Sequence, residues 1–205
     1  ADWDHRYKGE QMWSGNPNGV LVQEISGLPP GIALDVGAGE GGDAIWLAEH
    51  GWSVIASDIS QRALDRVHAE AKRRGVRVEC RHADANALDA FEAAAFDLVS
   101  AQYASIPRTP DDRGVRNLLD AVAPGGTLLV VSHDLESMRA PVDTPDHSRP
   151  FDPDAYVRVD DFAVALSASS AWDIEVHERR PRPAGAASAS HHTDDIVLRA
   201  RRSVR

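Results

Sequence analysis

The chain has 205 residues, 42% of them hydrophobic, which is enough for one buried core and predicts a single domain over residues 1–205. Its formal net charge of −10 excludes strong non-specific attraction to phosphate backbones, so no nucleic-acid partner is expected. The single cysteine, Cys80, excludes an internal disulfide and a multi-cysteine zinc site. The sequence shows neither a long apolar run nor a leader pattern, so we expect no membrane partner and a cytoplasmic location.

Residues 1–30 are polar but rich in aromatic side chains. Trp3, Tyr7 and Trp13 all precede the first predicted strand, in a stretch too polar for a core helix and too aromatic for a disordered tail. We therefore predict a helical lid over a binding site. The alternative is a helix whose rings only anchor it to the sheet. If Arg6 faces the site, it could pair with a carboxylate of the ligand.

Residues 33–48 read as a buried strand, a glycine turn and a helix. Gly37 and Gly39 can adopt positive φ, and the helix that begins near Gly41 aims unpaired N–H groups at the same place. This pattern predicts a nucleotide-binding turn. Gly42 would also fit a dinucleotide fingerprint, but Asp35 at the end of the strand would repel a pyrophosphate and suits an ammonium or sulfonium group.

Strands and helices continue to alternate after this turn, which predicts an α/β fold with a parallel, doubly wound sheet. The expected strands are 54–56, 76–82, 96–100 and 126–131, and the expected helices are 43–50, 60–73 and 115–122. Beyond a helix over 154–169, residues 172–178 and 195–200 alternate without a helix between them. If these two strands are neighbours they must pair antiparallel, so the sheet is predicted to end in a hairpin.

The spacing of Asp35, Gly37 and Gly39 resembles motif I of the class I S-adenosylmethionine-dependent methyltransferases. The resemblance implies S-adenosyl-L-methionine as cofactor and a Rossmann-like, seven-stranded, mostly parallel sheet whose antiparallel last strand lies beside the fifth. The N-terminal aromatics are similar to those of the small-molecule branch, which includes thiopurine, tellurite and sugar O-methyltransferases. We accordingly divide the chain into a lid (1–30), a cofactor-binding core (31–132) and an acceptor loop with helix and hairpin (133–205).

The cofactor site is predicted at the carboxyl ends of the strands. Asp58 follows the glycine turn by about 20 residues, where a carboxylate accepts from ribose hydroxyls, although it could instead cap a helix. The resemblance implies that Asp84 and Ala85 meet the adenine, whereas Glu40 is favoured by the helix dipole with or without a ligand. The predicted cofactor-binding residues are Trp13, Asp35, Gly37, Ala38, Gly39, Asp58, Ile59, Asp84, Ala85 and Ala101.

Methyl transfer requires a positioned acceptor and loss of its proton. His133 directly follows the fifth strand and is the predicted general base. Tyr103, beside Gln102 at the end of the fourth strand, and Asp134, which could orient His133, are the other predicted catalytic residues. No metal is expected; if one is needed, Asp134 and the pair His191-His192 are the candidates.

The predicted reaction is methyl transfer to a small molecule, with the hydroxyl of a sugar or another metabolite as the leading acceptor. A thiol, selenol or metalloid acceptor, a non-catalytic cofactor-binding module and a dinucleotide-dependent reductase are the alternatives. The run Ala101-Gln102-Tyr103-Ala104 departs from the Asn-Pro-Pro-Tyr motif, which disfavours amino groups of nucleic acid or protein glutamine. The proline-rich loop 135–153 is expected to bind the acceptor. We expect a monomer or homodimer.

Overall fold

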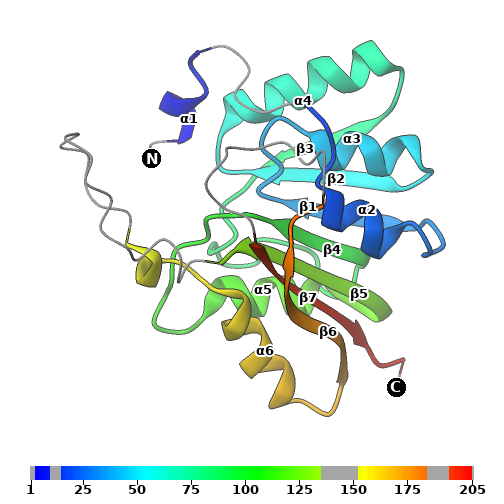
Figure 1. Ribbon diagram of the computed structural model, residues 1–205. Helices are drawn as coiled ribbons and strands as arrows, with labels where there is room; N and C mark the ends of the chain where they lie inside the picture. The colour runs from blue at the N-terminus through cyan, green and yellow to red at the C-terminus, as the bar shows by residue number, and fades with distance from the viewer. Residues whose placement is uncertain (1–2, 10–14, 135–151, 184–193, 205) are drawn as a thin grey trace.

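The computed structural model describes residues 3–9, 15–134, 152–183 and 194–204, which build an α/β fold around a seven-stranded sheet (Figure 1). The strand order is β3-β2-β1-β4-β5-β7-β6. Strands β1 to β5 run parallel, while β7 pairs antiparallel with both β5 and β6. The predicted fold class is thereby confirmed, including the antiparallel last strand beside the fifth. The strands are β1 (Ile32–Val36), β2 (Ser53–Asp58), β3 (Val78–His82), β4 (Phe96–Gln102), β5 (Val122–His133), β6 (Trp172–Pro181) and β7 (Asp194–Arg202).

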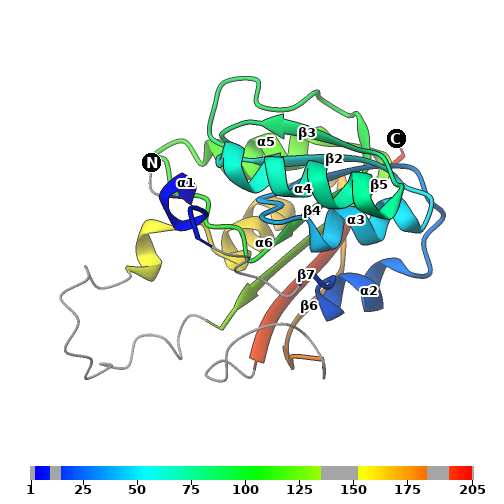
Figure 2. The same cartoon turned by 90° about the horizontal axis from the view of Figure 1, so that it is seen from above.

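Helices cover both faces of this sheet, because successive strand residues point to opposite sides. Leu34 of β1 belongs to the core that contains α5 and α6, whereas the preceding Ala33 belongs to the core that contains α2, α3 and α4. Figure 2 shows α2 beside the β7–β6 end of the sheet. The helices are α1 (Trp3–Arg6), α2 (Gly19–Ile25), α3 (Gly42–Glu49), α4 (Gln61–Arg74), α5 (Arg113–Ala121), the 3₁₀ turn η2 (Pro153–Ala155) and α6 (Val159–Ser167).

The ends of α4 follow from local chemistry. The Ser60 side chain accepts a hydrogen bond from Ala63 N at 3.2 Å, and Gly75 ends the helix with a φ of 70°. Both ends match the sequence prediction.

The single helix expected over 154–169 is wrong. A 3₁₀ turn at Pro153–Ala155 is followed by extended backbone, and α6 begins only at Val159. Val157 N donates to Ile106 O at 2.8 Å, and Arg108 N donates to Ala155 O at 2.9 Å. These long-range hydrogen bonds take up backbone groups that a helix would need, so the helix starts after them.

The N-terminal segment is attached to the start of α4, beside which α1 lies in both views (Figures 1 and 2). Asp4 accepts hydrogen bonds from Ser60 Oγ at 2.5 Å and from Arg62 N at 3.2 Å. Arg66 donates to the carbonyl oxygens of Tyr7 and Gly9 and pairs with Glu40. The Asp4 side chain and the carbonyl groups of Tyr7 and Gly9 therefore bind α4. These contacts bring the segment to the carboxyl edge of the sheet.

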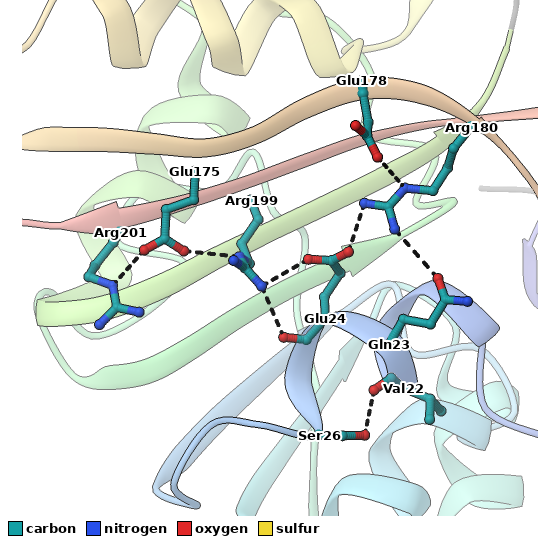
Figure 3. A network of polar contacts seen from close by, with 9 residues as sticks. All are labelled: Val22, Gln23, Glu24, Ser26, Glu175, Glu178, Arg180, Arg199 and Arg201. Carbon is teal, nitrogen blue, oxygen red and sulfur yellow. Dashed lines mark hydrogen bonds and ion pairs between the residues drawn. The ribbon is translucent and has the colours of Figure 1, made fainter.

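A network of charged side chains joins α2 to the terminal hairpin (Figure 3). Glu24 of α2 pairs with Arg180 of β6 at 2.7 Å and with Arg199 of β7 at 2.9 Å. Glu175 of β6 in turn pairs with Arg199 and with Arg201, both at 2.9 Å. Because Glu24 pairs with arginines of two strands that are far from it in the sequence, the network joins α2 to the hairpin. Across the described parts of the chain, every helix is too short or too polar to cross a membrane.

Candidate active site

A cavity of about 540 Å³ opens at the carboxyl ends of the parallel strands, where ligands bind in sheets of this kind. Its wall combines the ends of β1, β2, β4 and β5 with the loop after β3 and the N-terminal segment. From the predicted lid, Trp3, Arg6 and Tyr7 line it. From the predicted site, the structure brings together Asp35, Gly37, Ala38, Gly39, Asp58, Ile59, Asp84, Ala85, Tyr103 and His133 around this one cavity.

The glycine turn forms the floor of the cavity. Gly37 and Gly39 have φ angles of 71° and 55°, as predicted. Gly37 N and Ala38 N donate to Ser57 O at 2.8 and 3.0 Å, which holds the turn against the end of β2. A Cβ on Gly37 would lie 2.9 Å from Ala104 Cβ. The turn therefore needs glycine there for both its φ angle and its close packing.

Asp58 connects the glycine turn to the second strand. Its carboxylate accepts hydrogen bonds from Gly39 N at 2.9 Å and from Ser60 N at 2.8 Å. Burial raises the pKa of this carboxyl group, and the two amides act against that effect. Each carboxylate oxygen can accept a second hydrogen bond, so Asp58 is able to hold a ligand diol while it supports the turn. The capping role and the binding role are thus compatible.

Asp84 and Ala85 line the cavity in the loop after β3. The Asp84 carboxylate is exposed and accepts a hydrogen bond from Asn86 N at 2.8 Å, which stabilises its own loop. Each carboxylate oxygen can accept more than one hydrogen bond, so Asp84 keeps acceptor capacity for a ligand in the cavity.

Asp35 is the most buried carboxylate of the cavity, with 2% of its surface exposed. Its Oδ2 has no hydrogen-bond partner among the described residues. Burial, followed by the charges of Asp43 and Asp58, raises the pKa of Asp35 well above its ordinary value. Asp43 is itself held by Asn18, whose N and Nδ2 donate at 2.6 and 2.8 Å.

A second buried acceptor in the cavity wall, Gln102 Oε1, is also without a partner among the described residues. Asp35 and Gln102 lie on the neighbouring strands β1 and β4. Buried oxygens without donors fit a ligand that brings hydrogen-bond donors and positive charge, and an ammonium group brings both. Asp35 and Gln102 therefore suit a ligand that carries an ammonium group.

We predict that Asp35→Asn stabilises the ligand-free protein at neutral pH. The folded pKa of Asp35 lies above the unfolded value of about 3.9, so the folded state loses stability as pH rises through the interval between them. Asparagine keeps an oxygen for Ala44 N and has no proton to lose. Thermal unfolding should show a higher Tm for the variant at neutral pH, by about 2–4 °C per kcal/mol gained, with the difference shrinking toward about pH 4.

The matched control is Asp65→Asn, on the exposed face of α4, which should leave the Tm unchanged. A Tm of Asp35→Asn at or below that of the parent at neutral pH would contradict the assigned effect of burial. If Asp35 binds the cofactor, Asp35→Asn should also bind S-adenosylmethionine more weakly, because the amide lacks the negative charge.

Tyr103 and His133 lie together in the cavity wall, at the ends of β4 and β5. Their rings stack at a centroid distance of 4.5 Å and an angle of 29°. Tyr103 has a positive φ of 54°, an uncommon conformation for a tyrosine, and its N donates to Val131 O at 2.8 Å. The Tyr103 hydroxyl donates to Asp195 Oδ2 at 2.8 Å, and burial, followed by this hydrogen bond, raises the pKa of the phenol.

Two predicted site residues do not line the cavity. Ala101 is buried in the core formed with α5 and α6. Successive strand residues point to opposite faces of the sheet, so its neighbour Gln102 is the residue of β4 that reaches the cavity. Asp134 pairs with Arg179 at 2.8 Å, on the hairpin side of His133. Trp13 lies outside the described residues, as do His191-His192 and most of the loop 135–153. Within the described ranges, no group of three histidine, cysteine, aspartate or glutamate side chains could hold a metal ion.

Two parts of the site were missed by sequence reasoning. The cavity wall includes Ile106 and Val157, which are brought together by the backbone hydrogen bonds between their two loops. Arg182 and Asp195 lie behind Tyr103 and His133. Only Asp195 carried a sequence signal, as the first inward position of the alternating run 195–200. The contact of Arg182 with His133 joins residues 49 positions apart, and Ile106 and Val157 also belong to distant segments, so local pattern cannot reveal these contacts.

The fold and the cavity together define a nucleotide-binding α/β protein of the Rossmann-like type. Residues 33–126 match the family model described as a methyltransferase domain. The match confirms the resemblance to the class I S-adenosylmethionine-dependent methyltransferases and supports S-adenosylmethionine as the cofactor.

Among curated relatives, an uncharacterised protein of Mycobacterium tuberculosis and one of Mycobacterium bovis are each 31% identical over 135 residues, or 65% of this chain and 48% of the relative. The chain spans about half the length of these relatives.

Solved structures share the fold along most of the chain. One, from work on the conversion of a disulfide bond into a thioacetal group during echinomycin biosynthesis, has a TM-score of 0.73 and 23% identity, covering 99% of this chain and 92% of that one. An S-adenosylmethionine-dependent methyltransferase of Methanosarcina mazei has a TM-score of 0.66 and 19% identity, covering 93% and 100%. The 1,6-didemethyltoxoflavin-N1-methyltransferase of Burkholderia thailandensis, solved with 1,6-didemethyltoxoflavin and S-adenosylhomocysteine, has a TM-score of 0.62 and 21% identity, covering 90% of this chain and 75% of that one. At these identities the likeness shows the fold alone.

Proposed function

We propose that the protein transfers a methyl group from S-adenosylmethionine to a small molecule. The observation that carries the proposal is the convergence of Asp35, the Gly37–Gly39 turn and Asp58 on one cavity. In this proposal Asp58 binds the ribose hydroxyls, the Asp84–Ala85 loop binds the adenine, and Asp35 with Gln102 receives the amino acid end. Ile59 borders the ribose from the exposed side.

The cofactor supplies an activated methyl group on a sulfonium, so the protein has to orient the acceptor and exclude water. Trp3 and Tyr7 serve as the cover, held on α4 by Arg66. His133, Tyr103 and Ser132 form the wall on the acceptor side. Ile106, Tyr156 and Val157 complete that wall with mainly apolar surface, which fits an acceptor small enough to share the cavity with the cofactor.

We propose an oxygen as the leading acceptor atom, as the hydroxyl of a metabolite, and sulfur as the alternative. Support for either comes from the polar groups of His133 and Ser132 beside the apolar wall. The cytoplasmic location, the absence of a nucleic-acid partner, the monomeric or homodimeric state and the division at residues 30 and 132 stay predictions from the sequence.

Cofactor turnover tests the proposed function. The protein is incubated with S-adenosylmethionine and separate panels of thiols, phenols, carboxylic acids and alkyl alcohols, and S-adenosylhomocysteine is measured. We expect it to form above the level without protein in at least one panel. Binding of S-adenosylmethionine without turnover in any panel would favour a non-catalytic binding module. Binding of NADH in place of S-adenosylmethionine, measured by calorimetry, would favour a reductase.

A further inference from the structure

Arg182 and Asp195 form a buried ion pair behind the acceptor side of the cavity. The Asp195 side chain is fully buried, and that of Arg182 is 9% exposed. Arg182 donates to the two Asp195 oxygens at 3.1 and 3.5 Å, and its guanidinium lies 5.2 Å from the centroid of the Tyr103 ring. The Tyr103 hydroxyl also donates to Asp195. The carboxylate thus orients both the guanidinium and the phenol.

The same guanidinium contacts Nδ1 of His133. A guanidinium has only hydrogen-bond donors, so Nδ1 must be the acceptor. A neutral imidazole that accepts at Nδ1 carries its hydrogen on Nε2. Asp195 Oδ1 is 3.8 Å from Nδ1, which is beyond hydrogen-bond distance, so the carboxylate does not compete for this nitrogen.

This arrangement changes what His133 can do. The lone pair with which a neutral imidazole takes up a proton lies on Nδ1 and is engaged by Arg182. The remaining nitrogen, Nε2, already carries hydrogen and can only donate. Tyr103 is no substitute base, because its hydroxyl is committed to Asp195. The cavity therefore offers a hydrogen-bond donor at a place where the sequence predicted a general base.

We propose that Arg182 and Asp195 are positioning residues that hold His133 as an Nε2–H donor, and that the acceptor enters the site already ionised, as a thiolate, a phenolate or enolate, or a carboxylate. This inference rests on the proposed function and narrows its acceptor class. The anionic acceptor atom forms the new bond to the methyl carbon, the electron pair of the broken carbon–sulfur bond returns to the sulfonium sulfur, and no proton moves. The alkyl hydroxyl of a sugar is not in this class, because it must lose a proton.

Nuclear magnetic resonance of the histidine ring tests the positioning role directly. Protein labelled with the heavy nitrogen isotope in histidine is examined by long-range proton–nitrogen correlation above about pH 8, where an ordinary imidazole is neutral. Loss of a signal in His133→Gln identifies the ring. We expect the Nε2–H tautomer in the parent protein, a mixture of tautomers in Arg182→Met, and recovery of Nε2–H in Arg182→Lys, whose ammonium also donates.

The matched control is Arg201→Met, which removes an arginine that pairs with Glu175 on the outer hairpin and should leave the His133 signal unchanged. An Nδ1–H tautomer in the parent, or an unchanged tautomer in Arg182→Met, would overturn the proposal. These results do not depend on turnover, so they are distinct from a failure of the proposed function. In the acceptor panels, a preference for alkyl alcohols over thiols, phenols and carboxylic acids would also overturn it.

Discussion

Asp58→Ala should weaken S-adenosylmethionine binding by about 1.5–3 kcal/mol, or roughly 10- to 150-fold in Kd. The variant removes the proposed acceptor for the two ribose hydroxyls and also frees Gly39 N and Ser60 N, which donate to the Asp58 carboxylate. Isothermal calorimetry measures the change. Asp58→Asn retains one oxygen and should fall between the parent and the alanine variant.

Two controls separate loss of a ligand contact from loss of the fold. Asp65→Ala removes an exposed carboxylate of α4 and should leave the Kd unchanged. Thermal unfolding of Asp58→Ala should remain cooperative. A Kd equal to that of the parent would remove Asp58 from the ribose site and leave it with only its role in the turn.

Deletion of residues 1–13 should lower turnover on the order of 10²-fold, because the acceptor loses its cover and its alignment. The deletion takes Trp3, Arg6 and Tyr7 out of the cavity wall and removes the carbonyl partners of Arg66. All seven strands and the helices α2 to α6 lie outside the deleted stretch, so a folded protein is expected. Steady-state kinetics and circular dichroism measure the two effects.

The single variant Trp3→Ala is the matched test of the cover, because it removes one ring while Asp4 still anchors α1 to Ser60. Its effect should have the same direction and be smaller than that of the deletion. A truncated protein as active as the parent would show that the segment only packs against the rest of the domain and does not serve as a lid.

Much of the fold could be predicted because it depends on local pattern. The buried runs of β1 and β4, the cap at Ser60 and the positive φ of Gly37 each follow from a few neighbouring residues. The cavity residues at strand ends could be predicted for a related reason. Parallel strands bring their carboxyl ends to one edge, so Asp35 and Asp58 had to lie near each other once the strands were located.

The parts that could not be predicted depend on contacts between distant segments. The extended backbone at Tyr156 replaces a helical turn because it pairs with the loop after β4, and no local pattern records that pairing. The chemistry of His133 depends on Arg182, which is 49 residues further along the chain. Strand position correctly suggested that His133 reaches the cavity, but the hydrogen-bonding state of its ring is determined by the partner behind it.

Three buried carboxylates of the cavity wall lower the stability of the ligand-free folded protein. Burial raises the pKa of Asp35, of Asp43 and of Asp58, so each ionised form is disfavoured in the folded protein. Groups that oppose folding in this way are concentrated at functional sites. A ligand cation near these carboxylates would offset their charge, which supports the proposed sulfonium cofactor.

A crystal structure of the protein with S-adenosylhomocysteine would show whether this cavity is the cofactor site. We expect the ribose hydroxyls within hydrogen-bond distance of the Asp58 carboxylate, the adenine against Asp84 and Ala85, and the amino group toward Asp35. Density for the ligand outside the cavity, or with its ribose turned away from Asp58, would contradict the assignment of this cavity as the cofactor site.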